Sequence, residues 1–250
     1  MALAAALAGT VLMATPAEAA PPNCATTPIV AHRGLTAVAV ENTMRAMQGA
    51  LDEGVAFEAD VRTTSDNRMV LMHDAGITRT TNGRGLVAAL TARKIRSYRT
   101  SDGQIVPLVS SVLQVVRDTP GAHFYIELKA LNATTQSRLA DLITRYGIRD
   151  KVSAISFSGD LLGQFRVLNP GVQTYLIEKA LPPPEETVQY GGAHVYANLI
   201  TDEWRAQMQA LGIPYNARLT NTPEGWDVAL ARDVDSIMLD DVAGYRAYCV

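Results

Sequence analysis

The chain has 250 residues, 48% of them hydrophobic and 19% charged, so it can bury a full core, as one α/β barrel or as two small domains. Its 22 Lys and Arg face 25 Asp and Glu, a formal net charge of −3, and no basic run marks a surface for nucleic acid or an anionic membrane. A small-molecule partner is therefore favoured.

Residues 1–20 form an apolar run that ends in the small-x-small sequence Ala17-Glu18-Ala19, which is typical of a cleaved secretory signal. We therefore expect a signal peptide over residues 1–20 and a secreted, extracellular mature domain. A short membrane anchor is the alternative, but a run interrupted by Pro16 and Glu18 is too short to span a bilayer. We expect no stable membrane insertion.

The chain contains two cysteines, Cys24 before the first expected strand and Cys249 beside the C-terminus. In an oxidising compartment such a pair predicts a disulfide, with two free or buried thiols as the alternative. A metal role is disfavoured because there is no CxxC or Cys/His spacing. A bridge between the two ends would suit a closed barrel, whose first and last elements are neighbours.

Strand-like and helix-like stretches alternate along the rest of the chain without a linker. The expected strands are residues 28–32, 55–61, 123–128, 151–157, 172–177, 193–199, 213–219 and 235–240, and helical patterns include 41–54, 134–147, 201–212 and 222–233. Eight such units predict one α/β domain over residues 21–250, a (β/α)₈ TIM barrel. We expect a monomer.

One segment interrupts this alternation after the second strand. The chain runs through the apolar residues 69–74, a polar stretch at 77–85 and an amphipathic stretch at 86–98 before the next helical pattern. We expect a small insertion over about residues 75–110. Long excursions of this kind are often functional, as a wall or lid beside an active site.

Polar side chains gather where the first three expected strands end, which is the catalytic face of a parallel barrel. His32 and Arg33 follow the first strand; Glu58 and Asp60 lie two apart on the second, and Glu127 and Lys129 do so on the third, so each pair points to one face. Three carboxylates without a cysteine favour Mg²⁺ or Ca²⁺ over Zn²⁺. The alternative is a structural ion-pair network with Arg33 and Lys129.

Two histidines favour the catalytic interpretation. His73 follows an apolar run and could face His32 across the metal site. One imidazole would then take a proton from the attacking hydroxyl while the other gives a proton to the leaving oxygen. His123 and His194, which begin their expected strands at the opposite end of the barrel, are interpreted as structural.

In order and spacing, these residues resemble the glycerophosphodiester phosphodiesterase family. The resemblance rests on His32-Arg33-Gly34, Glu41-Asn42-Thr43, Glu58-Ala59-Asp60-Val61, His73-Asp74, residues 78–85, Pro107-Leu108 and Glu127-Leu128-Lys129. It implies a TIM-barrel hydrolase in which His32 and His73 are catalytic. By the same resemblance Glu58, Asp60 and Glu127 hold one divalent cation, Ca²⁺ or Mg²⁺, and Arg33 and Lys129 contact the phosphate.

The resemblance weakens late in the chain. The seventh strand of the family usually carries a Trp-Thr pair that faces the substrate, whereas the corresponding stretch here is Asn216-Ala217-Arg218-Leu219-Thr220-Asn221. The eighth strand ends in Leu239-Asp240-Asp241, where a Thr-Asp pair is more typical. The missing aromatic leaves room for a larger or more polar group, and Arg218 could meet an extra charge on it. Phe157 could form part of the site wall or only pack.

The implied activity is hydrolysis of a small-molecule glycerophosphodiester to glycerol phosphate and an alcohol. A phospholipase D-like hydrolase that cleaves the other P–O bond is a second hypothesis. A secreted protein that binds phosphodiesters without turnover is a third, although a binding protein would not need two titrating imidazoles.

Overall fold

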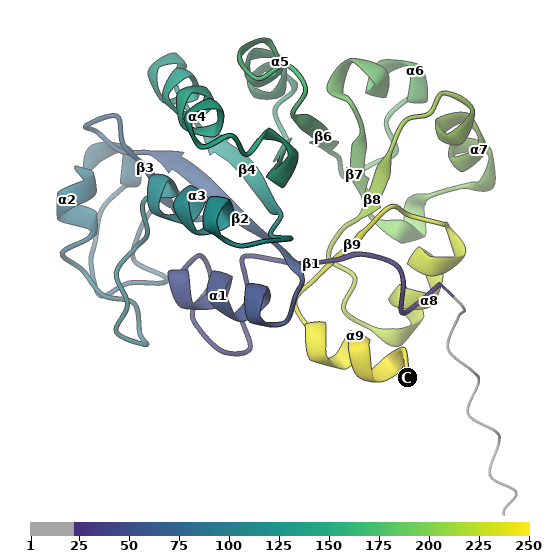
Figure 1. The fold of residues 1–250 in the computed structure, drawn as a ribbon, viewed down its shortest axis with the longest axis horizontal. Helices are drawn as coiled ribbons and strands as arrows, with labels where there is room; N and C mark the ends of the chain where they lie inside the picture. The colour runs from purple at the N-terminus through teal and green to yellow at the C-terminus, as the bar shows by residue number, and fades with distance from the viewer. Residues whose placement is uncertain (1–22) are drawn as a thin grey trace, which may run out of the picture.

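The computed structural model describes residues 23–250, so the expected signal peptide lies outside the described residues. Eight parallel strands form a closed barrel surrounded by helices (Figure 1). The strands are β1 (Ile29–Ala31), β2 (Ala56–Thr63), β4 (Phe124–Ala130), β5 (Val152–Ser156), β6 (Gln173–Ile177), β7 (Ala193–Val195), β8 (Tyr215–Ala217) and β9 (Ile237–Leu239). The predicted (β/α)₈ TIM barrel is confirmed. Every predicted strand range overlaps one of these strands, and β2 and β4 each extend two residues beyond the predicted end.

The barrel closes where β1 pairs with both β2 and β9. Val30 is in register with Ala56 on one side and with Met238 on the other. Because the first and last strands are neighbours, the described residues before β1 lie beside the C-terminal residues. Cys24 and Cys249 form the predicted disulfide there, with Cα atoms 5.4 Å apart.

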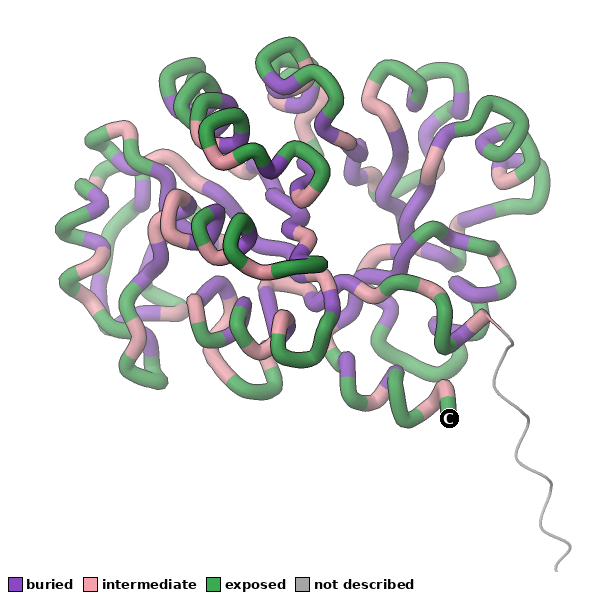
Figure 2. The backbone as a smooth tube through the Cα atoms, in the orientation of Figure 1, coloured by how far each residue is buried: buried purple, intermediate pink, exposed green. Residues whose placement is uncertain are grey.

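The main helices are α1 (Met44–Asp52), α3 (Val109–Asp118), α4 (Ala133–Tyr146), α5 (Gly159–Leu168), α7 (Asp202–Ala210), α8 (Pro223–Ala231) and α9 (Val242–Tyr248). Local sequence explains their ends. Thr43 caps α1 through its side chain, Asn132 and Thr135 form a capping box on α4, and Gly147 ends α4 with φ +65°. The outward faces of the helices are exposed, whereas the strands are buried (Figure 2).

Two layers of apolar side chains hold the barrel together. The larger core lies between the strands and the helices, with Phe57 and Phe124 stacked at 4.9 Å within it. A smaller cluster is made of Val30, Tyr125, Ile155, Tyr175, Ile177 and Met238. These residues alternate along their strands with members of the larger core, so they face the barrel interior.

The insertion has a small core of its own. It begins with β3 (Met69–Leu71), which pairs antiparallel with β2, and continues through the 3₁₀ turn η1 (Val87–Ala89) and the short helix α2 (Ala92–Ile95). Val70, Met72, Ile77, Val87, Ala92, Ile95 and Val106 form its buried cluster. In Figure 1 the insertion projects beyond β3, on the opposite side of the barrel from α7.

The remaining elements are short. They are η2 (Arg149–Lys151), α6 (Pro184–Thr187), η3 (Val188–Tyr190) and η4 (Ala197–Leu199). Within residues 23–250, no helix combines the length and the apolar composition needed to cross a bilayer.

Candidate active site

Three carboxylates meet at the mouth of the barrel. Strands β2 and β4 are in register at Asp60 and Glu127. Glu58 lies two residues before Asp60, so its side chain is on the same face of β2. Ligand oxygens of the three lie within 4.8 Å of one another. All three residues are buried, at 0%, 0% and 5% exposure for Glu58, Asp60 and Glu127. Buried like charges this close need compensating positive charge beside them.

The donor set of this cluster fits a hard divalent cation. Glu58 Oε1 and Asp60 Oδ1 are buried and accept no hydrogen bond from the described residues. Burial, together with the charges of Asp60 and Glu127, raises the pKa of Glu58 well above its usual range, and burial with Asp60 raises the pKa of Glu127. An oxygen-only site with free lone pairs suits Ca²⁺ or Mg²⁺.

Neighbouring groups fix the orientation of two of the carboxylates. Asn42 donates through Nδ2 to Asp60 Oδ2 at 2.8 Å and accepts from the Asp60 amide at 2.9 Å. The amide of Arg33 donates to Glu58 Oε2 at 2.9 Å. Arg33 and Asn42 both have φ of +57°, an unusual conformation for residues with a side chain. Strained backbone of this kind concentrates at functional sites.

His32 is held by an aspartate from the last strand-to-helix connection. Its Nδ1 lies 2.7 Å from Oδ1 of Asp240, which follows β9. Its Nε2 therefore faces the carboxylates, 4.0 Å from Glu58 Oε2. The hydrogen bond from His32 is the main cause of the lowered pKa of Asp240. Asn221 also donates to Asp240, at 2.7 Å, and steadies it.

His73 has the same kind of support. Its Nδ1 lies 2.7 Å from Oδ1 of Asp74, and the guanidinium of Arg62 donates to its backbone carbonyl at 2.7 and 3.0 Å. The Met72 amide donates to the carbonyl of Asp60 at 2.9 Å, which holds the backbone just before His73 beside Asp60 on β2. Hydrogen bonds from Arg79 and then His73 lower the pKa of Asp74 to about 2.

A charged network connects these groups across the mouth. Arg79 contacts Asp74 at 2.5 Å and Glu41 at 2.7 Å, and Glu41 in turn binds Arg33 at 3.1 Å. Arg33 Nε lies 3.5 Å from Asp60 Oδ2. On the opposite side of the cluster, Lys129 Nζ lies 2.7 Å from Glu127 Oε1 and 3.4 Å from Asp60 Oδ1.

The far side of the mouth is aromatic. The Lys129 ammonium lies 5.5 Å from the ring centroid of Phe157, and the guanidinium of Arg218 packs on Phe157 and Tyr196. Phe157 is 43% exposed, as a side chain on a site wall would be. The structure thus favours the site-wall interpretation of Phe157 over packing.

The two remaining histidines contact none of the carboxylates. His123 bonds Ser153 at 2.9 Å near the start of β4, in agreement with the structural interpretation. His194 lies in the middle of β7 rather than at the start of a longer strand. It is fully buried between Tyr125 and Tyr175, and burial followed by the charge of Arg218 lowers its pKa to about 3.

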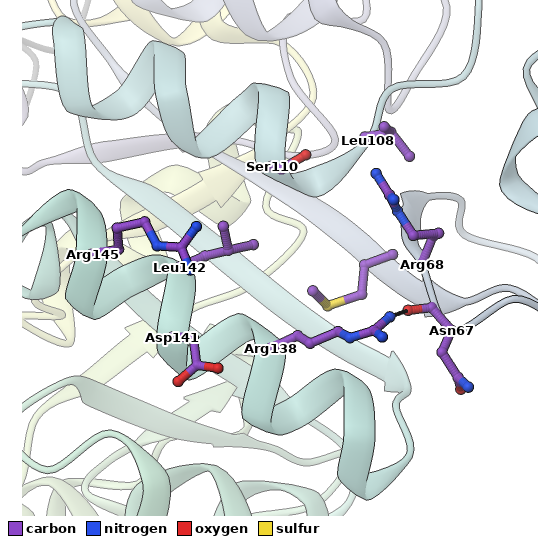
Figure 3. Close-up of a pocket in the computed structure, with 9 residues that line it drawn as sticks. Asn67, Arg68, Leu108, Ser110, Arg138, Asp141, Leu142 and Arg145 are labelled. Carbon is purple, nitrogen blue, oxygen red and sulfur yellow. Dashed lines mark hydrogen bonds between the residues drawn. The ribbon is translucent and has the colours of Figure 1, made fainter.

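A cavity of about 280 Å³ lies outside the barrel, between the start of β3 and α4. Figure 3 shows Arg68, Arg138 and Arg145 around it, with Arg138 donating to the backbone of Asn67. It contains none of the histidines or carboxylates described above, so we assign it no part in the chemistry.

The structure thus brings the predicted metal ligands, both predicted histidines and both predicted phosphate contacts to one face of the barrel. Sequence reasoning missed the supporting groups Asp240, Asp74, Glu41 and Arg79. Asp74 and Glu41 lie in the motifs His73-Asp74 and Glu41-Asn42-Thr43, and this position could have indicated that they support the site. Asp240 lies 208 residues from His32. Only closure of the barrel relates the two.

The sequence profile of the glycerophosphoryl diester phosphodiesterase family matches residues 32–243, which is most of the chain. The chain belongs to this family. A glycerophosphodiester phosphodiesterase of Bacillus altitudinis is 31% identical over 160 residues, covering 59% of the present chain and 64% of the relative. The chain thus spans less than two thirds of that relative's length.

Solved structures of the glycerophosphodiester phosphodiesterase family share the fold. One from Silicibacter pomeroyi has a TM-score of 0.80 at 21% identity, covering 89% of this chain and 93% of its own. A phosphodiesterase of Oleispira antarctica, in complex with the product sn-glycerol-3-phosphate, has a TM-score of 0.80 at 20% identity. The match covers 90% of this chain and 97% of the Oleispira antarctica chain. At these identities the likeness establishes the barrel, and the roles of individual residues are argued from their geometry.

Proposed function

We propose that the chain is a phosphoric diester hydrolase that cleaves glycerophosphodiesters to glycerol phosphate and an alcohol with the help of one divalent cation. The observation that carries this proposal is the arrangement of two imidazoles, each bound through Nδ1 to an aspartate, beside three buried carboxylates. The product named for the Oleispira antarctica phosphodiesterase is of the proposed class.

Each residue of the site has a role in this proposal. Glu58, Asp60 and Glu127 hold the cation, which when bound neutralises charge that develops on the phosphate oxygens. Arg33 binds a phosphate oxygen as a planar fork, and Lys129 binds one as a point charge. Lys129 Nζ lies 2.7 Å from Glu127 Oε1, so its ammonium would stand beside a phosphate held at the carboxylate cluster.

His32 and His73 move the protons. With Nδ1 bound to a carboxylate, each ring presents Nε2 to the substrate. One Nε2 accepts the proton of the attacking hydroxyl, that of a water or of the neighbouring glycerol hydroxyl, as the new P–O bond forms. The other donates a proton to the alcohol oxygen as the old P–O bond breaks. If the glycerol hydroxyl attacks, a water then opens the cyclic phosphate, so either route consumes one water. Asp240 and Asp74 stabilise the imidazolium that forms beside each of them.

We further propose that the protein is secreted and works as a monomer, with residues 21–250 as one mature domain. The signal-like sequence at residues 1–20 and the Cys24–Cys249 disulfide support an oxidising compartment. N-terminal sequencing of secreted protein and its mass in solution test these two points.

The deciding experiment is product identification. Purified protein is incubated with glycerophosphocholine and glycerophosphoethanolamine under Ca²⁺, Mg²⁺ or EDTA, and both products are identified. Glycerol phosphate plus choline or ethanolamine supports the proposal. Glycerol plus phosphocholine would identify cleavage on the other side of phosphorus, and binding without products would identify a binding protein.

A further inference from the structure

Arg218 lies at the mouth of the barrel, directly after β8. Its amide donates to the carbonyl of Val195 at 2.9 Å, where β7 ends. The next residue, Leu219, has φ of +50°, a left-handed conformation that leucine rarely adopts. The strain is of the kind that persists where the surrounding structure holds a functional group in place.

Two aromatic rings hold the guanidinium of Arg218. Its central carbon lies 4.9 Å from the ring centroid of Phe157 and 5.0 Å from that of Tyr196. Phe157 follows β5 and Tyr196 follows β7, so three strands contribute to this aromatic clamp. Attraction to ring faces fixes the guanidinium, which forms no direct ion pair with a carboxylate of residues 23–250, although its charge acts on Glu127 and opposes the rise in the pKa of that carboxyl.

This distinguishes Arg218 from the other cations at the mouth. Arg33 is paired with Glu41 and Asp60, and Lys129 is paired with Glu127. The Nη1 of Arg218, by contrast, is buried and finds no hydrogen-bond acceptor among residues 23–250. A buried charged donor without an acceptor is costly, and Arg218 as a whole is only half-buried, so its guanidinium has capacity left for a ligand oxygen.

Space for a ligand adjoins Arg218. A cavity of about 420 Å³ lies between the segment after β7, the loop after β8 and the first turns of α8, and both connections follow the carboxyl ends of their strands. Arg218 and Tyr196 form one part of its wall, and Asn198, Asn221 and Thr222 add polar groups. The carboxylate in the lining belongs to Glu224, which is exposed. The volume suits a small polar alcohol.

Around the barrel, Arg218 follows β8, whereas the metal carboxylates project from β2 and β4. A substrate whose phosphodiester lies at the metal site would extend its alcohol portion over Phe157 towards Arg218. We propose that Arg218 binds an anionic group on that alcohol and makes the enzyme selective for glycerophosphodiesters of anionic alcohols. This inference rests on the proposed function and adds the class of alcohol to it.

The test compares substrates that differ by one negative group. Glycerophosphoserine and glycerophosphoethanolamine differ by a carboxylate, and a phosphate-terminated glycerophosphoglycerol differs from glycerophosphoglycerol by a phosphate. Wild type should have a higher kcat/KM for the anionic member of each pair than for the other member. In Arg218→Gln this preference should fall by about 10- to 100-fold, mainly through KM, because one charge-assisted contact is lost. The substrate pair whose preference falls further in Arg218→Gln identifies the preferred anion, carboxylate or phosphate.

Two further variants make the result interpretable. Arg218→Lys keeps the charge but loses the planar fork, so its preference should lie between those of wild type and Arg218→Gln. Arg232→Gln is the matched control, because Arg232 binds Asp202 on the surface at 2.6 Å. Thermal unfolding of each variant monitors the fold, and the lysine variant supplies the comparison should the glutamine variant not fold.

The outcomes separate this inference from the proposed function. An equal loss for both members of a pair would mean that Arg218 binds the phosphodiester itself, and an unchanged preference would mean that it only packs; either result overturns the inference and leaves the proposed function standing. Failure of wild type to hydrolyse any of the four diesters would overturn both.

Discussion

The imidazole of His32 is joined to the carboxylate of Asp240 by a 2.7 Å contact between residues 208 positions apart in the chain. This contact leaves His32 Nε2 facing Glu58. Asp240→Asn keeps the shape but removes the charge, and we expect kcat to fall by about 10- to 1,000-fold because the imidazolium loses its partner. Steady-state kinetics measure this. Asp241→Asn is the control, since Asp241 caps α9 and asparagine caps equally well. Equal kinetics in both variants would contradict a role for Asp240.

The two histidines should act as a unit. If one accepts a proton while the other donates one, both are needed in the same transition state and their losses should not add. His32→Ala and His73→Ala should each lower kcat by about 10²–10⁴-fold, with the double variant scarcely slower than either. Metal affinity should persist in all three variants. A single variant that retains more than about a tenth of wild-type kcat would show that its histidine only positions substrate.

The carboxylate cluster should bind metal in competition with protons. Glu58→Gln, Asp60→Asn and Glu127→Gln should each weaken Ca²⁺ or Mg²⁺ binding by about tenfold or more in calorimetric titrations, because each removes a charged oxygen ligand. Chelation should abolish activity. The raised pKa values of Glu58 and Glu127 mean that protons occupy these groups as the pH falls, so metal affinity should fall with it.

A surface variant provides the comparison for these titrations. Glu53 pairs with Arg246 at 2.6 Å, away from the mouth, so Glu53→Gln should bind metal as wild type does. Full activity in excess EDTA would refute the metal requirement.

His194 should make stability depend on pH. Burial lowers its pKa to about 3 in the folded protein, whereas an unfolded histidine titrates near its ordinary value of 6.5. Below pH 6.5 the unfolded state therefore binds a proton that the folded state does not. This contribution should lower the free energy of unfolding by up to about 1.4 kcal/mol per pH unit between roughly pH 6 and 4.

Urea unfolding at a series of pH values measures this contribution. His194→Gln removes the titrating group, and its free energy of unfolding should fall less steeply on acidification than that of wild type. Comparison of slopes, rather than of absolute stabilities, cancels the cost of the substitution itself. Parallel slopes in the two proteins would show that His194 does not titrate as the structure indicates.

The disulfide should contribute strongly to stability. It closes a loop with a sequence separation of 225, and such a crosslink is worth about 5 kcal/mol at most in the chain-entropy model. Cys24→Ser with Cys249→Ser, or reduction of wild type, should lower the urea midpoint accordingly. An unchanged midpoint after reduction would assign the stabilisation to the packing of α9 instead.

Much of this site could be predicted because it depends on short-range geometry. Alternation along β2 places Glu58 and Asp60 on one face whatever the rest of the chain does. Glu127 joins them because β2 and β4 are neighbours in register at Asp60 and Glu127. The aspartate partner of His32 depends on barrel closure and register, which no local pattern encodes. The same holds for the clamp around Arg218, whose rings follow two other strands.

The insertion was harder to describe from sequence for a different reason. Residues 69–74 are an apolar run whose composition would also suit another parallel strand. In the structure, β3 instead pairs antiparallel with β2, and its Val70 belongs to the separate small core of the insertion. An antiparallel return and a parallel strand have similar composition. What distinguishes them is the tight connection from Thr63 to Met69, too short for a crossover helix.

The joining of Cys24 to Cys249 also determines how the molecule responds to force. The two cysteines lie outside β1 and β9, on either side of the seam where these strands pair. Tension applied between the chain ends is therefore carried by the covalent bridge and does not reach the hydrogen bonds of the seam. While the disulfide is intact, force applied to the two ends should leave the barrel closed. After reduction, the same force should separate β1 from β9.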